Sequence, residues 1–197
     1  GGAEGLHVSG PIIFDALGAA TRKEDPRDAP RPFQRDRDGI VVGEGAGILI
    51  LEALDHATAR GATILGEVLG FGTTCDAAHM SAAEPGGMVR AIEACLADAG
   101  LPASAVDHVN AHATGTGTGD ASEAEALHQV FGDRPSVTSL KGHLGHTLGA
   151  CGAIESILAL EGMRRGVAPP VRGLSDPDVA PIRLLRTPQL AAHRLVL

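Results

Sequence analysis

The sequence predicts an α/β domain built around a mixed or parallel sheet. Two observations support this: short apolar runs alternate with amphipathic helical segments, and glycines stand where several of those segments end. Alternation of this kind places helices against the faces of a sheet, so a layered αβα arrangement is expected. With 197 residues, the chain is long enough to form a hydrophobic core.

Composition excludes several classes of protein. Aromatic residues make up only 2% of the chain, so its core must be built from Ala, Val, Leu and Ile. A net charge of -8 argues against nucleic-acid binding, which needs clustered Lys and Arg. No apolar run approaches the roughly 20 residues that cross a bilayer, and no signal peptide is apparent. Three separated cysteines favour reduced thiols in a cytoplasm.

The first helical and loop segments follow from local pattern. Residues 11–19 predict a short helix with Ile13, Phe14 and Leu17 on one face. Residues 21–39 are charged and rich in proline, which predicts a solvated surface loop. A second short helix is expected over residues 55–60, and Gly61 is expected to end it.

Two apolar stretches predict buried strands, over residues 40–51 and 62–70. The first contains Gly43, Gly45 and Gly47, a spacing that resembles part of a dinucleotide-binding loop. A strand rather than a helix follows these glycines, so they indicate a bend or bulge inside a strand pair and not a nucleotide site.

Downstream, helices and strands alternate clearly. The predicted helices are 85–100, 121–131 and 148–163, and the predicted strands are 106–111 and 136–140. The last helix is expected to turn Cys151, Ile154, Leu158 and Met163 inward. The proline-rich tail from Val167 predicts loops with one or two strands.

The first chemical motif follows the strand at 106–111. His112 stands at the strand exit, and Thr114 and Thr116 alternate with glycines that let backbone approach a ligand closely. Asp120 and Glu123 come next. They could form a helix capping box, with Asp120 as N-cap, or belong to the site.

The second motif follows the strand at 136–140 and contains Lys141, His143 and His146. Because His146 precedes a helix, the positive end of the helix dipole should favour its neutral form. A neutral imidazole can donate one N–H to a developing oxyanion. The spacing fits no common zinc ligand set, so no metal is expected. Cys95 and Cys151 are interpreted as small core residues, and Cys75 as a loop residue with no nucleophile-type turn around it.

The two histidine motifs, in this order, resemble those of the β-ketoacyl-acyl carrier protein synthase family. His112 to Thr116 resembles its first His motif, although Ala113 replaces the usual Gly, and Lys141 to His146 resembles its Lys-x-x-x-Gly-His motif. Supporting similarities cover the rest of the chain: Arg31-Pro32-Phe33, Arg37-Asp38-Gly39, Gly43 to Gly47, and Asp76 to Met80.

This resemblance implies a thiolase-like fold, of which the chain would be mostly the C-terminal half. Residues 1–61 would end the N-terminal half, and residues 62–197 would form most of the C-terminal half. The family's nucleophilic cysteine is expected upstream of Gly1, and its Gly-Phe-Gly-Gly stretch after Leu197. The nucleophile is therefore unknown in this sequence, and the chain alone is expected to be inactive.

The resemblance also implies a reaction, decarboxylative Claisen condensation in fatty-acid or polyketide synthesis. His112 and His146 would donate hydrogen bonds to a malonyl thioester, while Lys141 and Glu123 would form a supporting ion pair with Asp120 close by. Thr114 and Thr116 would bind the phosphopantetheine arm of an acyl carrier protein. No cofactor is implied, and a cytoplasmic homodimer is expected of the full-length protein.

Three other functions stay open. The chain could belong to a non-catalytic partner of the chain-length-factor kind, although two intact His motifs weigh against that. It could be an inactive fragment. A non-decarboxylative, thiolase-like reaction is the third, but that family usually replaces one of the two histidines.

Overall fold

The computed structural model describes residues 1–77, 83–190 and 192–197. Its helices are α1 (Ser9–Ala16), α2 (Leu54–Ala59), α3 (Pro85–Ala99), α4 (Gly117–Phe131), α5 (Lys141–Leu144) and α6 (Cys151–Arg165), with 3-10 turns η1 (Ala103–Ala105) and η2 (Leu148–Ala150). Its strands are β1 (Gly2–Glu4), β2 (Gly45–Gly47), β3 (His108–Asn110), β4 (Ser136–Thr138), β5 (Val167–Ala168), β6 (Arg183–Leu184) and β7 (Gln189–Leu190).

Parallel and antiparallel pairing occur together, as the sequence predicts. Strands β3, β4 and β6 form a parallel sheet with β4 in the middle. Two antiparallel pairs, β1–β2 and β5–β7, lie outside it. The chain therefore has a mixed α/β architecture.

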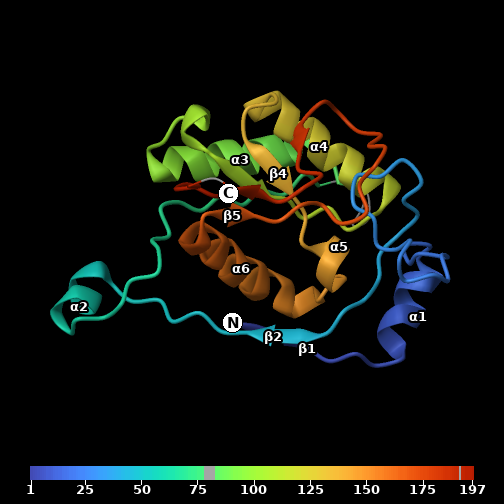
Figure 1. Cartoon of the computed structure of the whole chain (residues 1–197), viewed down its shortest axis with the longest axis horizontal. Helices are drawn as coiled ribbons and strands as arrows, with labels where there is room; N and C mark the ends of the chain where they lie inside the picture. The colour runs from blue at the N-terminus through green and yellow to red at the C-terminus, as the bar shows by residue number, and fades with distance from the viewer. Residues whose placement is uncertain (78–82, 191) are drawn as a thin grey trace.

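One face of the β3–β4–β6 sheet carries the main core. Helices α3 and α4 cover this face (Figure 1). Val109 and Val137 pack there against Leu127 and Phe131 of α4, because alternate residues of a strand face opposite sides of a sheet. Small and aliphatic side chains dominate this core, in keeping with the scarcity of aromatic residues.

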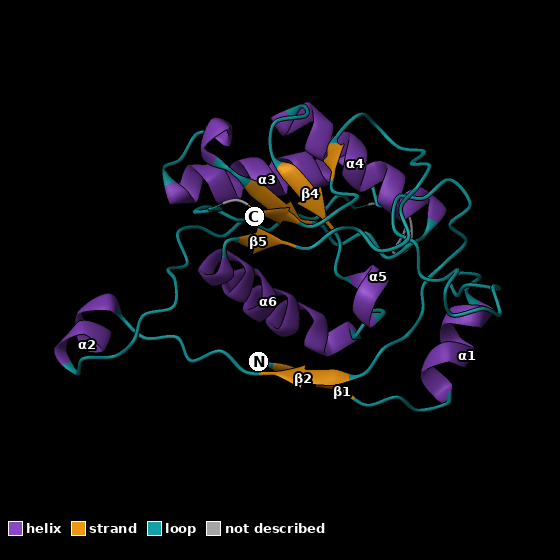
Figure 2. Ribbon diagram, viewed as in Figure 1, coloured by secondary structure: helices purple, strands orange, loops and turns teal. Residues whose placement is uncertain are grey.

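The other face of the sheet is more polar and lies against α6. His108, Asn110 and Thr138 face the α6 residues Leu158 and Met163 across a small cavity. On its far side α6 contacts the β1–β2 pair, so the helix lies between two layers of strand (Figure 2). This helix–sheet–helix–strand layering places the carboxyl ends of β3 and β4 beside the N-terminal end of α6.

Most predicted helices are confirmed. Helices α3 and α6 end at Gly100 and Gly166, both in the left-handed conformation that glycine favours, with φ of 65° and 63°. Helix α4 begins at Gly117, earlier than predicted. The inward face assigned to α6 is only partly right, because Leu158 is exposed and no residue of that helix is fully buried.

The buried strands predicted over 40–51 and 62–70 are wrong for most of their length. Only Gly45–Gly47 forms a strand, paired with β1, which confirms the strand-pair interpretation of the glycines. Large apolar side chains of both segments are exposed, among them Ile50 and Val68. A strand needs a neighbour for its backbone hydrogen bonds. Among the described residues, Ile40 and Val42 form only isolated bridges, with Ala20 and His146, and residues 48–51 and 63–70 have no strand neighbour. Figure 1 shows α2 between these two extended segments, away from the sheet.

The loop over 21–39 has no helix or strand, but its centre is not solvated. Pro32, Phe33 and Gln34 are buried, and Phe33 belongs to the main core. Phe33 could not be recognised as a core residue from sequence because charged residues surround it. In the structure it packs in the core, and its N–H donates to Asp120 of α4. The apolar face predicted for the first helix is exposed instead, at Ile13 in α1 and at Leu17 just after it. Within the part of the chain that the structure describes, no helix is long and apolar enough to cross a membrane.

Candidate active site

The site forms where two neighbouring parallel strands end. Asn110 and Thr138 pair at the carboxyl ends of β3 and β4. His112 follows β3 by two residues, and Lys141 follows β4 by three. Because parallel strands end at the same edge of a sheet, the two sequence motifs meet there, as predicted.

His112 and His146 are brought into direct contact. Their ring centroids lie 5.1 Å apart and the rings meet edge to face, at 84°. The Nδ1 atom of His146 is buried and has no hydrogen-bond partner among the described residues. Protein atoms surround much of His112, but the residue still has surface open to solvent, so the pair lies at an accessible edge of the sheet.

The segment 41–43 fixes the backbone of His146. The His146 N–H donates to the Val41 carbonyl at 2.7 Å, and the Gly43 N–H donates to the His146 carbonyl at 2.9 Å. Gly145 makes this approach feasible. It adopts φ of 72°, and a Cβ there would lie 2.9 Å from the Val41 oxygen. Residues far apart in sequence thus orient the second histidine.

Both histidines are neutral near pH 7. Burial lowers the pKa of His112 to about 4, with the positive charge of Lys141 as the second cause and His146 as the third. Burial and then Lys141 likewise lower the pKa of His146 to about 4. Solvent on one side of His112 moderates the desolvation there. The predicted neutral form is supported, but burial and Lys141 cause it, since α6 begins only at Cys151.

Glu123 holds the loop that carries His112. Its two carboxylate oxygens accept the backbone N–H groups of His112 and Ala113, each at 2.7 Å. Burial raises the pKa of Glu123, and these two N–H donors oppose that rise. Glu123 therefore positions the main chain next to His112.

Lys141 pairs with a different carboxylate from the one expected. Its Nζ lies 2.7 Å from Glu155 Oε1, and its side chain is only 1% exposed. Asn110 Nδ2 donates to the other oxygen of Glu155 at 3.0 Å. The predicted Lys141–Glu123 ion pair is wrong as a direct contact: Glu123 accepts two backbone N–H groups and feels the charge of Lys141 only at longer range, while α6 turns Glu155 towards Lys141.

Asp120 is not an N-cap. Helix α4 begins at Gly117 with Thr116 before it, so Asp120 lies inside the first turn. Its oxygens accept the Gly115 N–H at 3.1 Å and the Phe33 N–H at 2.8 Å. The capping-box interpretation is therefore wrong, and Asp120 joins the Gly-rich loop to the buried loop at Phe33.

Thr114 and Thr116 lie together in that Gly-rich loop. Their hydroxyl oxygens are 3.2 Å apart, and Thr114 is buried while Thr116 is half-buried. His143 lies apart from the histidine pair and contacts the Pro170 carbonyl through Nε2 at 2.9 Å. Cys75 is exposed, and Cys95 and Cys151 are half-buried. The stretch Asp76 to Met80 lies largely outside the described residues.

Matches to family models show which family the chain belongs to. The model of the β-ketoacyl synthase N-terminal domain matches residues 1–57, and that of the C-terminal domain matches residues 65–175. The chain belongs to the β-ketoacyl synthase family. Among its curated relatives, the chloroplastic 3-oxoacyl-[acyl-carrier-protein] synthase II of Arabidopsis thaliana is 46% identical over 88% of this chain and 32% of the relative. Nodulation protein E of Rhizobium meliloti is 47% identical over 85% of this chain and 43% of the relative.

Solved structures agree with the family assignment. A β-ketoacyl synthase from Burkholderia phymatum superposes with a TM-score of 0.95 at 44% identity, over 98% of this chain and 48% of that one. A ketosynthase in complex with its type II polyketide acyl carrier protein gives a TM-score of 0.89 at 32% identity, over 97% and 49%. These neighbours confirm the thiolase-like α/β fold. The chain spans less than half the length of these relatives.

Two polar residues of the site, Glu155 and Asn110, were missed from sequence. A usable signal existed, because Glu155 stands four residues after Cys151, on the face of the helix that was predicted to point inward. A carboxylate on an inward face requires a cation or several donors. The partner of Lys141 could have been sought there.

Proposed function

We propose that the complete protein is a β-ketoacyl-acyl carrier protein synthase, which condenses a malonyl thioester with an enzyme-bound acyl group. The observation that carries this proposal is the pair of neutral imidazoles, 5.1 Å apart at the ends of two parallel strands. The family membership of the chain supports it.

The chemistry suits two neutral donors. Loss of CO₂ breaks the bond between the malonyl carboxylate and its α-carbon, and the electron pair passes to the thioester as an enolate. The enolate oxygen carries charge that the ground-state carbonyl does not. N–H bonds from His112 and His146 therefore strengthen towards the transition state. The α-carbon then attacks the acyl group and displaces the thiolate that held it.

The other residues support this step in separate ways. Burial, and then the positive charge of Lys141, lower the pKa of both histidines and favour their neutral form; Glu155 pairs with Lys141. Glu123 holds the main chain at His112. Thr114 and Thr116 present hydroxyls for the phosphopantetheine arm, with Asp120 fixing their loop. The proposal assigns the nucleophilic role to none of the cysteines of this sequence, Cys75, Cys95 and Cys151, and it invokes no metal or dissociable cofactor.

The partner is proposed to be an acyl carrier protein bearing phosphopantetheine thioesters. A structural neighbour is a ketosynthase in complex with such a carrier protein, which supports this assignment. Homodimerisation, a cytoplasmic location and the division of the chain at residue 61 stay predictions.

A non-catalytic partner subunit is the main competing function. One structural neighbour, 39% identical, is the ishigamide ketosynthase/chain length factor. The two neutral histidines in contact favour the catalytic assignment, because a non-catalytic subunit does not need a pair of hydrogen-bond donors for an enolate.

The test is product formation by the complete enzyme. Incubation with an acyl carrier thioester and malonyl-carrier protein should give a β-ketoacyl-carrier protein two carbons longer than the acyl donor, read by intact mass. If the protein gains an acyl group but never elongates it, or gains none, the condensing function is wrong.

A further inference from the structure

Arg37 is a buried arginine that joins segments far apart in the chain, and besides the contacts that follow its Nη1 lies 3.5 Å from the Asp178 carbonyl oxygen. Its side chain is 6% exposed. Nε donates to the Thr116 carbonyl at 3.2 Å, and Nη2 donates to the Gly117 carbonyl at 2.9 Å. Nη1 donates to the Gln34 carbonyl at 2.8 Å in its own loop. One guanidinium therefore connects the loop at 34–37 to the loop that carries the two threonines.

A buried guanidinium requires acceptors for its N–H groups and a counter-charge. Asp120 supplies the charge, with Oδ2 at 3.6 Å from Arg37 Nε and no exposure of its own. The same carboxylate accepts the N–H groups of Gly115 and Phe33. Asp120 thus accepts hydrogen bonds from N–H groups of both loops, while Arg37 donates hydrogen bonds to backbone carbonyls of both loops.

The two loops also touch directly. Gly115, between the threonines, has φ of 89°, and a Cβ there would lie 3.0 Å from the Gly39 carbonyl oxygen. Arg37 fixes the peptide that follows Thr116, and Asp120 fixes the N–H that precedes it. The direction of both threonine hydroxyls, which lie 3.2 Å apart, depends on this frame.

We propose that Arg37 is a positioning residue, which sets the Thr114 and Thr116 hydroxyls and so the affinity for the pantetheine arm. This inference rests on the proposed function. Arg37 does not touch the reacting atoms, because its donors all end on backbone carbonyls and on Asp120. Lysine cannot replace it, since an ammonium is a point charge that cannot reach carbonyls on both loops in a fixed plane.

The experiment compares two substrates in the complete enzyme carrying Arg37→Lys. One is malonyl-pantetheine. The other is a malonyl thioester of a simple alkyl thiol, which lacks the amides of the arm. The KM for malonyl-pantetheine should rise about tenfold, which corresponds to about 1.4 kcal/mol. The kcat, and the KM for the alkyl thioester, should stay within about twofold of the parent values.

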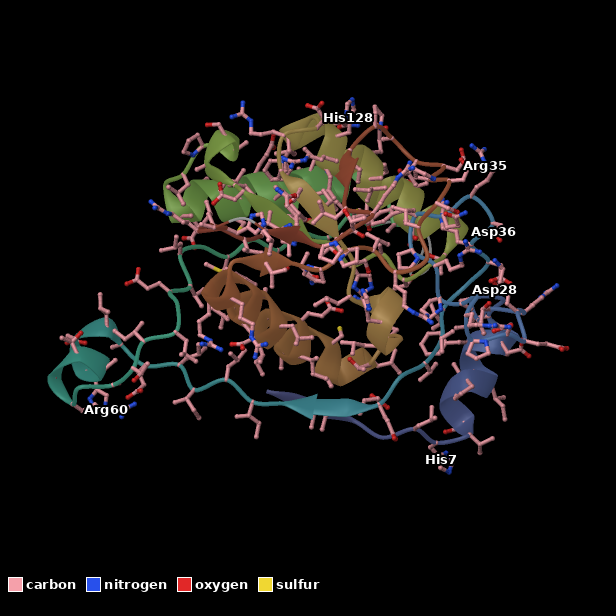
Figure 3. All side chains as sticks on the ribbon, viewed as in Figure 1. His7, Asp28, Arg35, Asp36, Arg60 and His128 are labelled. Carbon is pink, nitrogen blue, oxygen red and sulfur yellow. The ribbon has the colours of Figure 1, made fainter. Side chains whose placement is uncertain are left out.

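Arg35→Lys is the matched control. Arg35 belongs to the same loop but lies at the outer surface, where it pairs with Asp176 and Asp178 (Figure 3). It makes no contact with the Gly-rich loop that the structure records, so both KM values should match the parent. Arg37→Gln serves as a second variant and should show the same selective rise in KM.

The inference fails if Arg37→Lys leaves the KM for malonyl-pantetheine unchanged. It is equally contradicted if the variant raises the KM values of both substrates equally, or if kcat falls by as much as the KM for malonyl-pantetheine rises. It also fails if neither variant folds, since Arg37 would then be a purely structural residue. A parent enzyme that condenses nothing refutes the proposed function itself, which the parent assay shows before any variant is made.

Discussion

Lys141 is a buried ammonium group with one close carboxylate. Its Nζ contacts Glu155 at 2.7 Å, and Glu155 also accepts from Asn110. A buried charge that loses its partner keeps its desolvation cost. The site therefore depends on Glu155 for its integrity even though Glu155 belongs to neither histidine motif.

Glu155→Gln should lower the free energy of unfolding by about 3 kcal/mol, because it leaves the Lys141 charge unpaired. Urea denaturation of the 197-residue chain measures this. The control is Glu161→Gln, which removes a partner from the surface arginines Arg164 and Arg165. That change removes only solvent-exposed ion pairs, so the free energy of unfolding should stay close to the parent value. Equal losses in the two variants would show that Lys141 does not depend on Glu155.

His108 is a second buried histidine, outside the proposed site. Its ring lies 5.0 Å from that of His193, and its Nδ1 is 2.8 Å from Ser136 Oγ. Burial, and then His193, lower the pKa of His108 to about 4 from an ordinary 6.5. The folded chain thus resists protonation at this position.

His108 makes stability depend on pH. An unfolded chain binds a proton at this residue below pH about 6.5, whereas the folded chain does so only near pH 4, so stability is lost as the pH falls between these values. The loss should reach about 3 kcal/mol. His108→Gln should remove this part of the difference in unfolding free energy between pH about 7 and about 4. If parent and variant lose stability equally on acidification, the His108 pKa is not lowered by folding.

Among the elements, the turn between α5 and α6 places His146. Gly145 in this turn is left-handed and faces the Val41 carbonyl at close range, so it admits no side chain. The turn and the 41–43 segment therefore act together, and a change in either displaces the second histidine.

Gly145→Ala should destabilise the protein by about 1–3 kcal/mol, from left-handed strain and the close carbonyl. It should also slow malonyl decarboxylation in the complete enzyme. Gly152→Ala in α6 is the control, because a Cβ there meets open space and alanine favours a helix. That variant should be as stable as the parent or more so by urea denaturation. A Gly145→Ala protein with parent stability and rate would contradict this view of the turn.

The helices and the parallel strands were predictable because each carries its own signal. Amphipathic spacing marks α3 and α4, and glycine C-caps mark the ends of α3 and α6. The segments 40–51 and 62–70 carry an equally strong strand pattern, but among the described residues only Gly45–Gly47 belongs to a paired strand. The sequence pattern of a segment shows which of its faces would be apolar in a strand. Whether the segment pairs depends on whether another strand lies beside it in the folded chain.

The residues of the two site motifs could be predicted from sequence, but the ion pairs that these residues form could not. His112, His146, Lys141 and the two threonines follow from their place after strands. Whether Lys141 pairs with Glu123 or Glu155 depends on the packing of α6, which the spacing does not determine. Arg37 was noted from sequence only within the Arg37-Asp38-Gly39 similarity, in a loop expected to be solvated. Its burial could not be predicted because Phe33, in the same loop, lies in the core.

At the scale of the whole molecule, the segment 41–43 and the buried loop at 33–37 complete a site built mainly from β3, β4 and their following loops. The chain spans less than half the length of the relatives it matches. Apolar side chains of the segments beside α2 face solvent over a wide area, as surfaces that contact other polypeptide do. The chain is therefore one part of a β-ketoacyl synthase, the part that carries the two histidine motifs.

The most direct measurement is the rate of CO₂ release from malonyl-carrier protein by the complete enzyme carrying His112→Ala or His146→Ala. Each should lower the rate on the order of a hundredfold or more, the loss of one oxyanion donor, while acyl transfer to the nucleophile continues. His7→Ala and His128→Ala, at the outer surface, should match the parent (Figure 3). Release at near the parent rate in either site variant would contradict the central claim that the two histidines stabilise the enolate together.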